Sequence, residues 1–271
     1  MFVRTERSVR EFISFYPIVS IIIVLNILVW LLMYIIPIDY RYGLSLGDVL
    51  FAYGIGQNAA ISNGEYWRLF TPIFMHAQGF AHVGFNSFSL ILFGPALEQM
   101  VGKIKFIAAY LGAGLLANIG VYLLDPSSST LHLGASGAIY GLFGIYIFMI
   151  YFRKHLIDPA SAGIVQAIFI FGLIMSFLQP RVNVAAHVCG FIGGLIIAAP
   201  ILINAEAFSH VKNYMKRSKS RQTDDTDNRD ASFNPNRWKR SNRLSAETSR
   251  KLKWILFFTI LIAFLIMSYY A

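Results

Sequence analysis

Seven apolar stretches constrain the fold of this chain more than any other feature of its sequence. They run roughly over residues 17–37, 82–101, 104–124, 135–152, 160–178, 185–204 and 252–270. A helix needs about 20 mostly apolar residues to cross a hydrocarbon core about 30 Å thick. The sequence therefore predicts an all-α polytopic membrane protein.

The composition supports this class. Only 14% of the residues are charged and 56% are hydrophobic, whereas soluble domains have about 25% charged residues. The mean hydropathy is +0.57. These values argue against an ordinary soluble domain, although a net charge of +9 by itself suggests a nucleic-acid-binding protein.

The distribution of the basic residues argues against nucleic acid. If the N-terminus is cytoplasmic, 20 of the 23 Lys and Arg residues lie on the cytoplasmic side, and only Arg41, Arg68 and Arg181 lie outside. Cytoplasmic loops of membrane proteins carry such an excess, and these charges can contact anionic lipid headgroups. We therefore expect a multi-pass protein, most simply of the cell membrane, that has membrane lipid and no nucleic acid among its partners.

The spans divide the chain into four parts. Residues 1–16 are expected to form a cytoplasmic N-terminal segment, and 17–204 a six-helix core whose external loop covers 38–81. The loop is rich in aromatic residues and glycine, and we expect Tyr66 and Trp67 to anchor it in the membrane interface. Residues 205–250 read as a polar, disordered cytoplasmic linker, and 251–271 as an additional transmembrane helix.

Four polar residues fall at one depth of the predicted core. His82 and Asn86 begin the second span on one helix face, Ser136 begins the fourth, and His187 begins the sixth. All three spans run from outside to inside, so these residues lie near the outer surface. Polar residues in membrane spans are costly and usually functional.

Two rows of glycine predict how these spans pack. Gly137, Gly141 and Gly144 follow Ser136, and Gly190 and Gly194 follow His187. Rows of small residues let membrane helices approach closely. If the two rows face each other, the Ser136 hydroxyl and the His187 imidazole can come within hydrogen-bond reach, about 2.6–3.2 Å.

This pairing suggests nucleophilic catalysis. A serine hydroxyl is a weak nucleophile until a base accepts its proton, and the oxyanion that forms on the attacked carbonyl needs donors already in place. His82, Asn86 and the free backbone N–H of Ser136 at a helix N-terminus can supply them.

These residues resemble the rhomboid family of intramembrane serine proteases. The matching motifs are Gly-Ala-Ser-Gly at 134–137 with Tyr140, His-Val-Gly-Phe-Asn at 82–86, Ala-His-Val-Cys-Gly-Phe-Ile-Gly-Gly at 186–194, and the pair Trp67–Arg68. The resemblance covers roughly residues 15–205, and the seventh span is similar to the family's six-plus-one form.

The resemblance implies a Ser136–His187 dyad without an acidic third member, and oxyanion contacts from His82, Asn86 and the Ser136 amide. It implies that Tyr140 packs against the His187 ring, that Gly134, Gly137 and Gly190 support the site, and that the fifth helix and the loop near 179–183 form its gate and cap. The substrates would be transmembrane proteins, and no cofactor or metal is expected.

Two charged residues are interpreted as structural. Glu98, near the cytoplasmic end of the second span, is expected to be a hydrogen-bond anchor, about four turns from the candidate site. Arg68 is expected to hold the external loop together.

Three alternatives stay open. A zinc hydrolase could use His76, His82, His132 and His187, although they lack a helical ligand spacing. A transporter could also carry polar residues in its spans, but these usually lie at the midplane. An inactive rhomboid-like protein that binds client membrane helices is the third.

Overall fold

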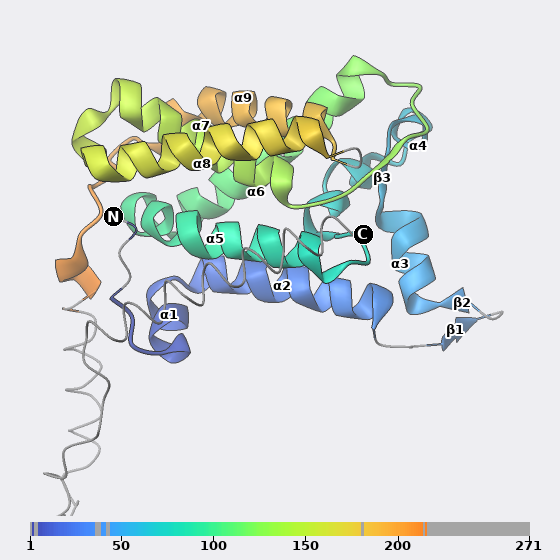
Figure 1. Ribbon diagram of the computed structural model, residues 1–271. Coiled ribbons are helices and arrows are strands. Elements are labelled where there is room, and N and C mark those ends of the chain that lie inside the picture. The colour runs from blue at the N-terminus through green and yellow to red at the C-terminus, as the bar shows by residue number, and fades with distance from the viewer. Residues whose placement is uncertain are drawn as a thin grey trace, which may run out of the picture. The chain divides into compact units, whose positions relative to one another are not determined.

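A computed structural model of the chain describes residue 2 and residues 5–35, 39–41, 44–179, 182–213 and 215. Within these residues, five helices are long and apolar enough to cross a membrane, and a sixth apolar helix is shorter. The five are α2 (Pro17–Tyr34), α5 (Phe80–Val101), α6 (Lys103–Leu124), α8 (Pro159–Leu178) and α9 (Val184–Ile201), and the shorter one is α7 (Ser136–Phe152) (Figure 1). Six predicted spans thus coincide with helices, which confirms the all-α bundle, and the predicted span 252–270 lies outside the described residues.

The remaining elements are short. The helices are α1 (Val9–Phe15), α3 (Leu46–Gly54) and α4 (Asn58–Ser62), and the 3-10 turns are η1 (Tyr66–Leu69), η2 (Thr71–Phe74) and η3 (Lys154–Leu156). Strand β1 (Asp39–Arg41) pairs with β2 (Leu44–Ser45), and β3 (Gly56–Gln57) pairs with β4 (Leu131–His132), both antiparallel. The second pair ties the external loop to the segment that leads into α7.

Side chains fix where the long helices begin. The Glu98 carboxylate accepts hydrogen bonds from the backbone N–H groups of Ile18 and Val19, at 3.1 and 2.9 Å. These N–H groups belong to the first turn of α2 and have no intrahelical partner, so a buried carboxylate satisfies them. The predicted anchoring role of Glu98 is confirmed. Asp158 and Asn183 cap α8 and α9 in the same way through their own side chains.

Helix α7 is the centre of the bundle. It packs against α6 and α9, and its residues from Gly137 to Tyr146 are all buried. Helix α2 packs along α5 (Figure 1). In contrast, α8 buries only Ser161, Val165 and Ser176, so most of its surface faces away from the protein.

The predicted glycine contact between α7 and α9 is confirmed. A Cβ added to Gly190 would lie 2.1 Å from the Gly137 carbonyl oxygen, and one added to Gly194 would lie 1.9 Å from that of Gly141. Both distances are far below van der Waals contact. The two backbones therefore touch at both positions, and the contact of Gly137 with Gly190 lies within one turn of Ser136 and His187.

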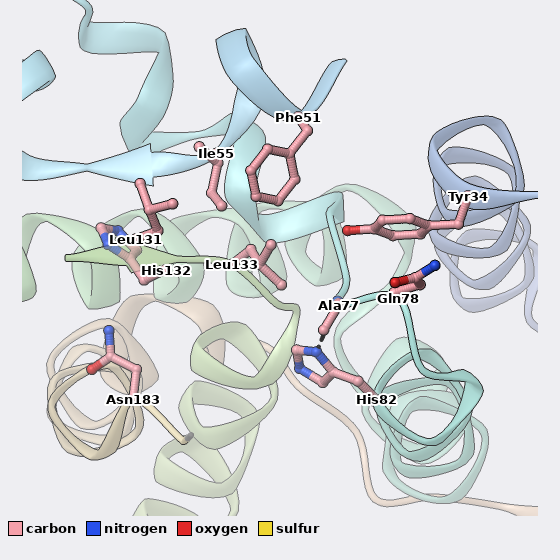
Figure 2. A pocket seen from close by; sticks show the side chains of 10 residues that line it. All are labelled: Tyr34, Phe51, Ile55, Ala77, Gln78, His82, Leu131, His132, Leu133 and Asn183. Atoms are coloured by element: carbon pink, nitrogen blue, oxygen red, sulfur yellow. Dashed lines mark hydrogen bonds between the residues drawn. The ribbon is translucent and has the colours of Figure 1, made fainter. Parts of the chain in front are cut away.

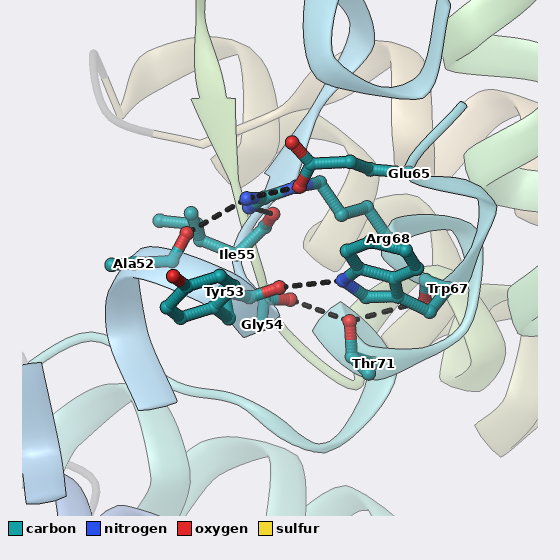
Figure 3. Close-up of polar contacts among 8 residues, drawn as sticks. All are labelled: Ala52, Tyr53, Gly54, Ile55, Glu65, Trp67, Arg68 and Thr71. Carbon is teal, nitrogen blue, oxygen red and sulfur yellow. Dashed lines mark hydrogen bonds and ion pairs between the residues drawn. The ribbon is translucent and has the colours of Figure 1, made fainter. Parts of the chain in front are cut away.

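The external loop is folded around Arg68, a residue that is 6% exposed. Its guanidinium donates to the carbonyl oxygens of Ile55 at 2.7 Å and Ala52 at 2.8 Å, and to the Glu65 carboxylate at 2.7 Å (Figure 3). Nearby, the Trp67 indole N–H donates to the Tyr53 carbonyl oxygen at 2.8 Å. The structural role of Arg68 is confirmed, while anchoring of the loop in the membrane interface stays a prediction.

The segment after α9 differs from the disordered linker expected at 205–250. Residues 205–213 lie against the protein, where the Gln99 amide oxygen accepts from Ser209 N–H at 2.8 Å. The Asn213 amide donates to the Tyr16 hydroxyl at 2.7 Å, and Asn213 is buried. The expectation is therefore wrong for 205–213, because Ser209 and Asn213 pair there with Gln99 of α5 and with Tyr16 between α1 and α2. Composition does not reveal such pairs. Residues 216–250 lie outside the described residues.

Candidate active site

Ser136 is placed by an unusual turn at Gly134. The φ of Gly134 is +130°, a backbone conformation that L side chains rarely adopt, and its N–H donates to the Pro72 carbonyl oxygen at 2.9 Å. A Cβ here would lie 2.8 Å from His82 Nε2 and 3.6 Å from Ser136 Oγ. Ser136 Oγ and a ring nitrogen of His82 thus both border the space that a side chain at Gly134 would fill.

The hydrogen bond at Nδ1 of His82 determines whether its Nε2 donates or accepts. The Ala77 backbone N–H donates to His82 Nδ1 at 3.2 Å (Figure 2). Since Nδ1 accepts, the neutral ring carries its proton on Nε2, the atom on the Ser136 side. His82 can therefore donate a hydrogen bond beside Ser136, as an oxyanion contact requires.

Asn86 lies one turn below His82 on α5. Its side-chain N–H donates to the His82 carbonyl oxygen at 2.9 Å, and Asn86 is 5% exposed. The amide carries two N–H donors, so one stays available after this bond. The structure places Asn86 on the helix face that carries His82, as expected.

His187 is held by two neighbours. Its ring stacks on Tyr140 with 4.1 Å between the ring centroids and 12° between the planes, so the expected packing of Tyr140 is confirmed. Its Nδ1 lies 2.7 Å from Ser176 Oγ on α8. The sequence does not predict a role for Ser176, because a serine in an apolar helix carries no motif that distinguishes it from a packing residue.

The structure brings Ser136 and His187 to the same helix contact but does not pair them. Ser136 precedes Gly137, which touches Gly190 of α9, and His187 lies one turn before Gly190. Among the described residues, no hydrogen bond joins Ser136 Oγ to the His187 ring. The dyad is therefore a prediction that the helix packing permits. In proteins without substrate, catalytic hydrogen bonds are often long and tighten only in the substrate complex.

A cavity of about 420 Å³ lies beside His82. Its wall includes Ala77 and Gln78 before α5, Leu133 after β4, and Asn183 at the start of α9 (Figure 2). The cavity thus adjoins the beginnings of α5, α7 and α9. It provides space for water or for a segment of another chain next to the candidate oxyanion donors.

The other histidines of this end do not form a metal site. His76 is fully buried, its ring centroid lies 5.1 Å from that of His82, and burial together with nearby His82 lowers the pKa of His76 to about 3. Within the part of the chain that the structure describes, no three His, Cys, Asp or Glu side chains gather to hold a metal ion. The arrangement of the histidines therefore gives no support to the zinc hydrolase.

The fold and the site define a polytopic helical membrane protein with a serine and a histidine at the contact of two adjacent helices. A family model described as the Rhomboid domain matches residues 63–204. The chain belongs to the rhomboid family and is a multi-pass integral membrane protein.

Individual relatives agree with this assignment. The chain is 42% identical over 198 residues to a putative rhomboid protease of Bacillus subtilis, YdcA, which covers 73% of this chain and 94% of that protein. It is 35% identical over 162 residues to the rhomboid protease GluP of the same organism, over 59% of this chain and 31% of that protein. It is 31% identical to RHOMBOID-like protein 5 of Arabidopsis thaliana, over 56% of this chain and 50% of that protein. Two of these relatives are named as proteases, which supports protease activity.

Proposed function

We propose that this protein is an intramembrane serine endopeptidase that cleaves transmembrane protein substrates near the outer face of the membrane. The observation that carries this proposal is the contact of α7 with α9 through Gly137 and Gly190, which holds the helix ends with Ser136 and His187 together. The protease names of two relatives support the reaction type.

The chemistry follows from the atoms at this contact. His187 takes the proton of Ser136 Oγ, which attacks the scissile carbonyl carbon, and the oxyanion accepts hydrogen bonds from His82 Nε2–H, Asn86 and the Ser136 N–H. His187 then gives its proton to the leaving amine, so that the peptide bond breaks and an acyl ester remains on Ser136. Water, deprotonated by His187, hydrolyses the ester and restores the serine.

The length of α7 supports cleavage below the membrane surface. With 17 residues it spans roughly 26 Å at 1.5 Å per residue, less than a hydrocarbon core of about 30 Å. Ser136 at its first position is thus expected to lie beneath the surface, and the cavity beside His82 to admit the water that hydrolysis consumes. The bias of basic residues assigns this end to the outer side.

Labelling with a serine-reactive fluorophosphonate tests the proposal. The purified wild-type protein should be labelled and should cleave a reporter transmembrane helix, whereas Ser136→Ala should do neither. Ser20→Ala is the matched control, because Ser20 is also buried but lies on α2 with its hydroxyl bonded to the Tyr16 carbonyl oxygen. Cleavage by Ser136→Ala at the wild-type rate would refute the proposal.

A rhomboid-like protein that only binds client helices is the second candidate. It is favoured by one observation, the missing hydrogen bond between Ser136 and His187 within the described residues. This candidate predicts that the wild-type protein captures a reporter helix in a crosslinking assay, without fluorophosphonate labelling and without cleavage.

A further inference from the structure

Ser176 lies at the centre of a buried group of hydrogen bonds that the proposed dyad does not use. Its Oγ is 2.7 Å from His187 Nδ1, 3.0 Å from the Tyr140 hydroxyl and 2.7 Å from the Gly172 carbonyl oxygen. The residue is 4% exposed. Three polar groups from three helices therefore meet at one hydroxyl.

Only one arrangement of protons satisfies all three contacts. A serine hydroxyl has one proton to donate and two lone pairs that accept. The Gly172 carbonyl oxygen can only accept, so it takes the Ser176 proton. The Tyr140 hydroxyl and His187 Nδ1 must then both donate to Ser176 Oγ.

This arrangement fixes the tautomer of His187. If Nδ1 carries the proton of the neutral ring, Nε2 has a free lone pair. A ring with the opposite tautomer would offer N–H at Nε2 and could not accept the proton of Ser136. In soluble serine proteases a buried aspartate imposes this tautomer on the histidine.

We infer that Ser176 is a positioning residue that holds His187 in the tautomer in which it can act as the base toward Ser136. The inference rests on the proposed function. A neutral hydroxyl takes the place at Nδ1 that a carboxylate holds in a Ser-His-Asp triad. It accepts a hydrogen bond from Nδ1–H both before Ser136 transfers its proton to Nε2 and afterwards. The stacked Tyr140 ring sets the plane of the imidazole, and Ser176 sets its protonation.

Because Ser176 belongs to α8, the tautomer of His187 depends on where α8 lies. This helix buries few of its residues, and near the site it meets α7 where Gly172 leaves room for Tyr140: a Cβ at Gly172 would lie 2.9 Å from the Tyr140 hydroxyl oxygen. Displacement of α8 by a few ångströms would break both hydrogen bonds that join Ser176 to α7 and α9. His187 is therefore competent only while α8 is packed against its neighbours.

The inference is tested by measuring the kinetics of cleavage and, separately, the tautomer of His187. Ser176→Ala should lower kcat for a reporter transmembrane helix about ten- to a hundredfold, the effect of one hydrogen bond to a group that becomes charged, and should leave KM unchanged. Ser176→Thr should retain most of the activity, because threonine keeps the hydroxyl and its bond to the carbonyl four residues earlier. Ser161→Ala, the same change at the other buried serine of α8, should have no effect.

Nitrogen-15 spectra of histidine-labelled protein report the tautomer directly. The His187 signals, assigned by difference against His187→Gln, should show a protonated Nδ1 in the wild type and a loss of this preference in Ser176→Ala. An unchanged kcat in Ser176→Ala overturns the inference. A lowered kcat with an unchanged tautomer overturns it as well, since it would mark Ser176 as a packing residue.

Failure of the inference and failure of the proposed function remain distinguishable. The spectra can be recorded in Ser136→Ala protein, where no turnover is needed. If Ser136→Ala abolishes labelling and cleavage while the tautomer does not respond to Ser176→Ala, only the role of Ser176 is refuted.

Discussion

Gly134 shows how one residue can be required for two independent reasons. Its φ of +130° is costly for any residue with a Cβ, and the space that a Cβ would occupy borders both His82 Nε2 and Ser136 Oγ. The first reason concerns folding, and the second concerns the site alone. The two can be separated by comparing stability with activity.

Gly134→Ala is expected to lower the rate of cleavage strongly while it lowers the stability of the protein only moderately. The unfavourable φ costs about 1–2 kcal/mol, which corresponds to a decrease in Tm of several degrees for a chain of this size. The methyl group must also displace His82, which lies 2.8 Å away, so reporter cleavage should decrease by a hundredfold or more, the effect of losing an oxyanion donor. Thermal unfolding in detergent and reporter cleavage measure the two effects.

Gly163→Ala is the matched control for this change. A Cβ at Gly163 meets no atom of the described residues within 4 Å, so neither Tm nor cleavage should decrease. Wild-type cleavage by Gly134→Ala would contradict the placement of His82 beside Ser136.

At the scale of helices, the sequence predicts what depends on hydropathy and small-residue spacing. Six apolar helices, five of them long enough to cross a membrane, and the close contact of α7 with α9 are confirmed, because length, apolarity and glycine rows directly determine them. The fold of the external loop was not predictable in the same way. Its contacts include hydrogen bonds from Arg68 to the carbonyl oxygens of Ala52 and Ile55. Every residue has a backbone carbonyl, so the residue type does not show which carbonyl accepts such a bond.

The same limit applies to the candidate site. Ser136, His187 and His82 could be proposed because each begins a span, and Tyr140 because it lies one turn after Ser136 in a recognised motif. Ser176 could not be proposed, because its role depends on the rotation of α8 about its axis. A nearly uniformly apolar helix does not specify that rotation.

Gly194→Ala tests the contact between α7 and α9. A Cβ at Gly194 would lie 1.9 Å from the Gly141 carbonyl oxygen, so the helices must separate, at a cost of about 1–3 kcal/mol for an overpacked core. We expect a lower Tm and weaker fluorophosphonate labelling of Ser136. Gly112→Ala on α6 is the control, since its Cβ would meet only Ile197 at an ordinary 3.7 Å. Equal Tm values for the two variants would argue against backbone contact between α7 and α9.

For the whole molecule, the buried histidine His76 couples folding to pH. Neither of its ring nitrogens forms a hydrogen bond of standard geometry with a described residue, although a backbone contact at Phe74 weakly favours the charged ring. Burial, together with nearby His82, lowers the pKa of His76 to about 3, from about 6.5 in an unfolded chain. Burial also lowers the pKa of His132. Both imidazoles are thus neutral in the folded protein near pH 7.

The free energy of unfolding should therefore decrease as the pH falls below about 6.5. Between that value and about 3 the unfolded chain binds a proton at His76 that the folded protein does not, so acid favours unfolding. At pH 5.5 this one group should cost about 1.4 kcal/mol relative to pH 8, seen as a lower Tm in detergent. His76→Phe removes the titrating group but keeps an aromatic ring, and should weaken the pH dependence while His132 maintains part of it. If His76→Phe and the wild type lose stability equally between pH 8 and pH 5.5, His76 is not buried as a neutral ring.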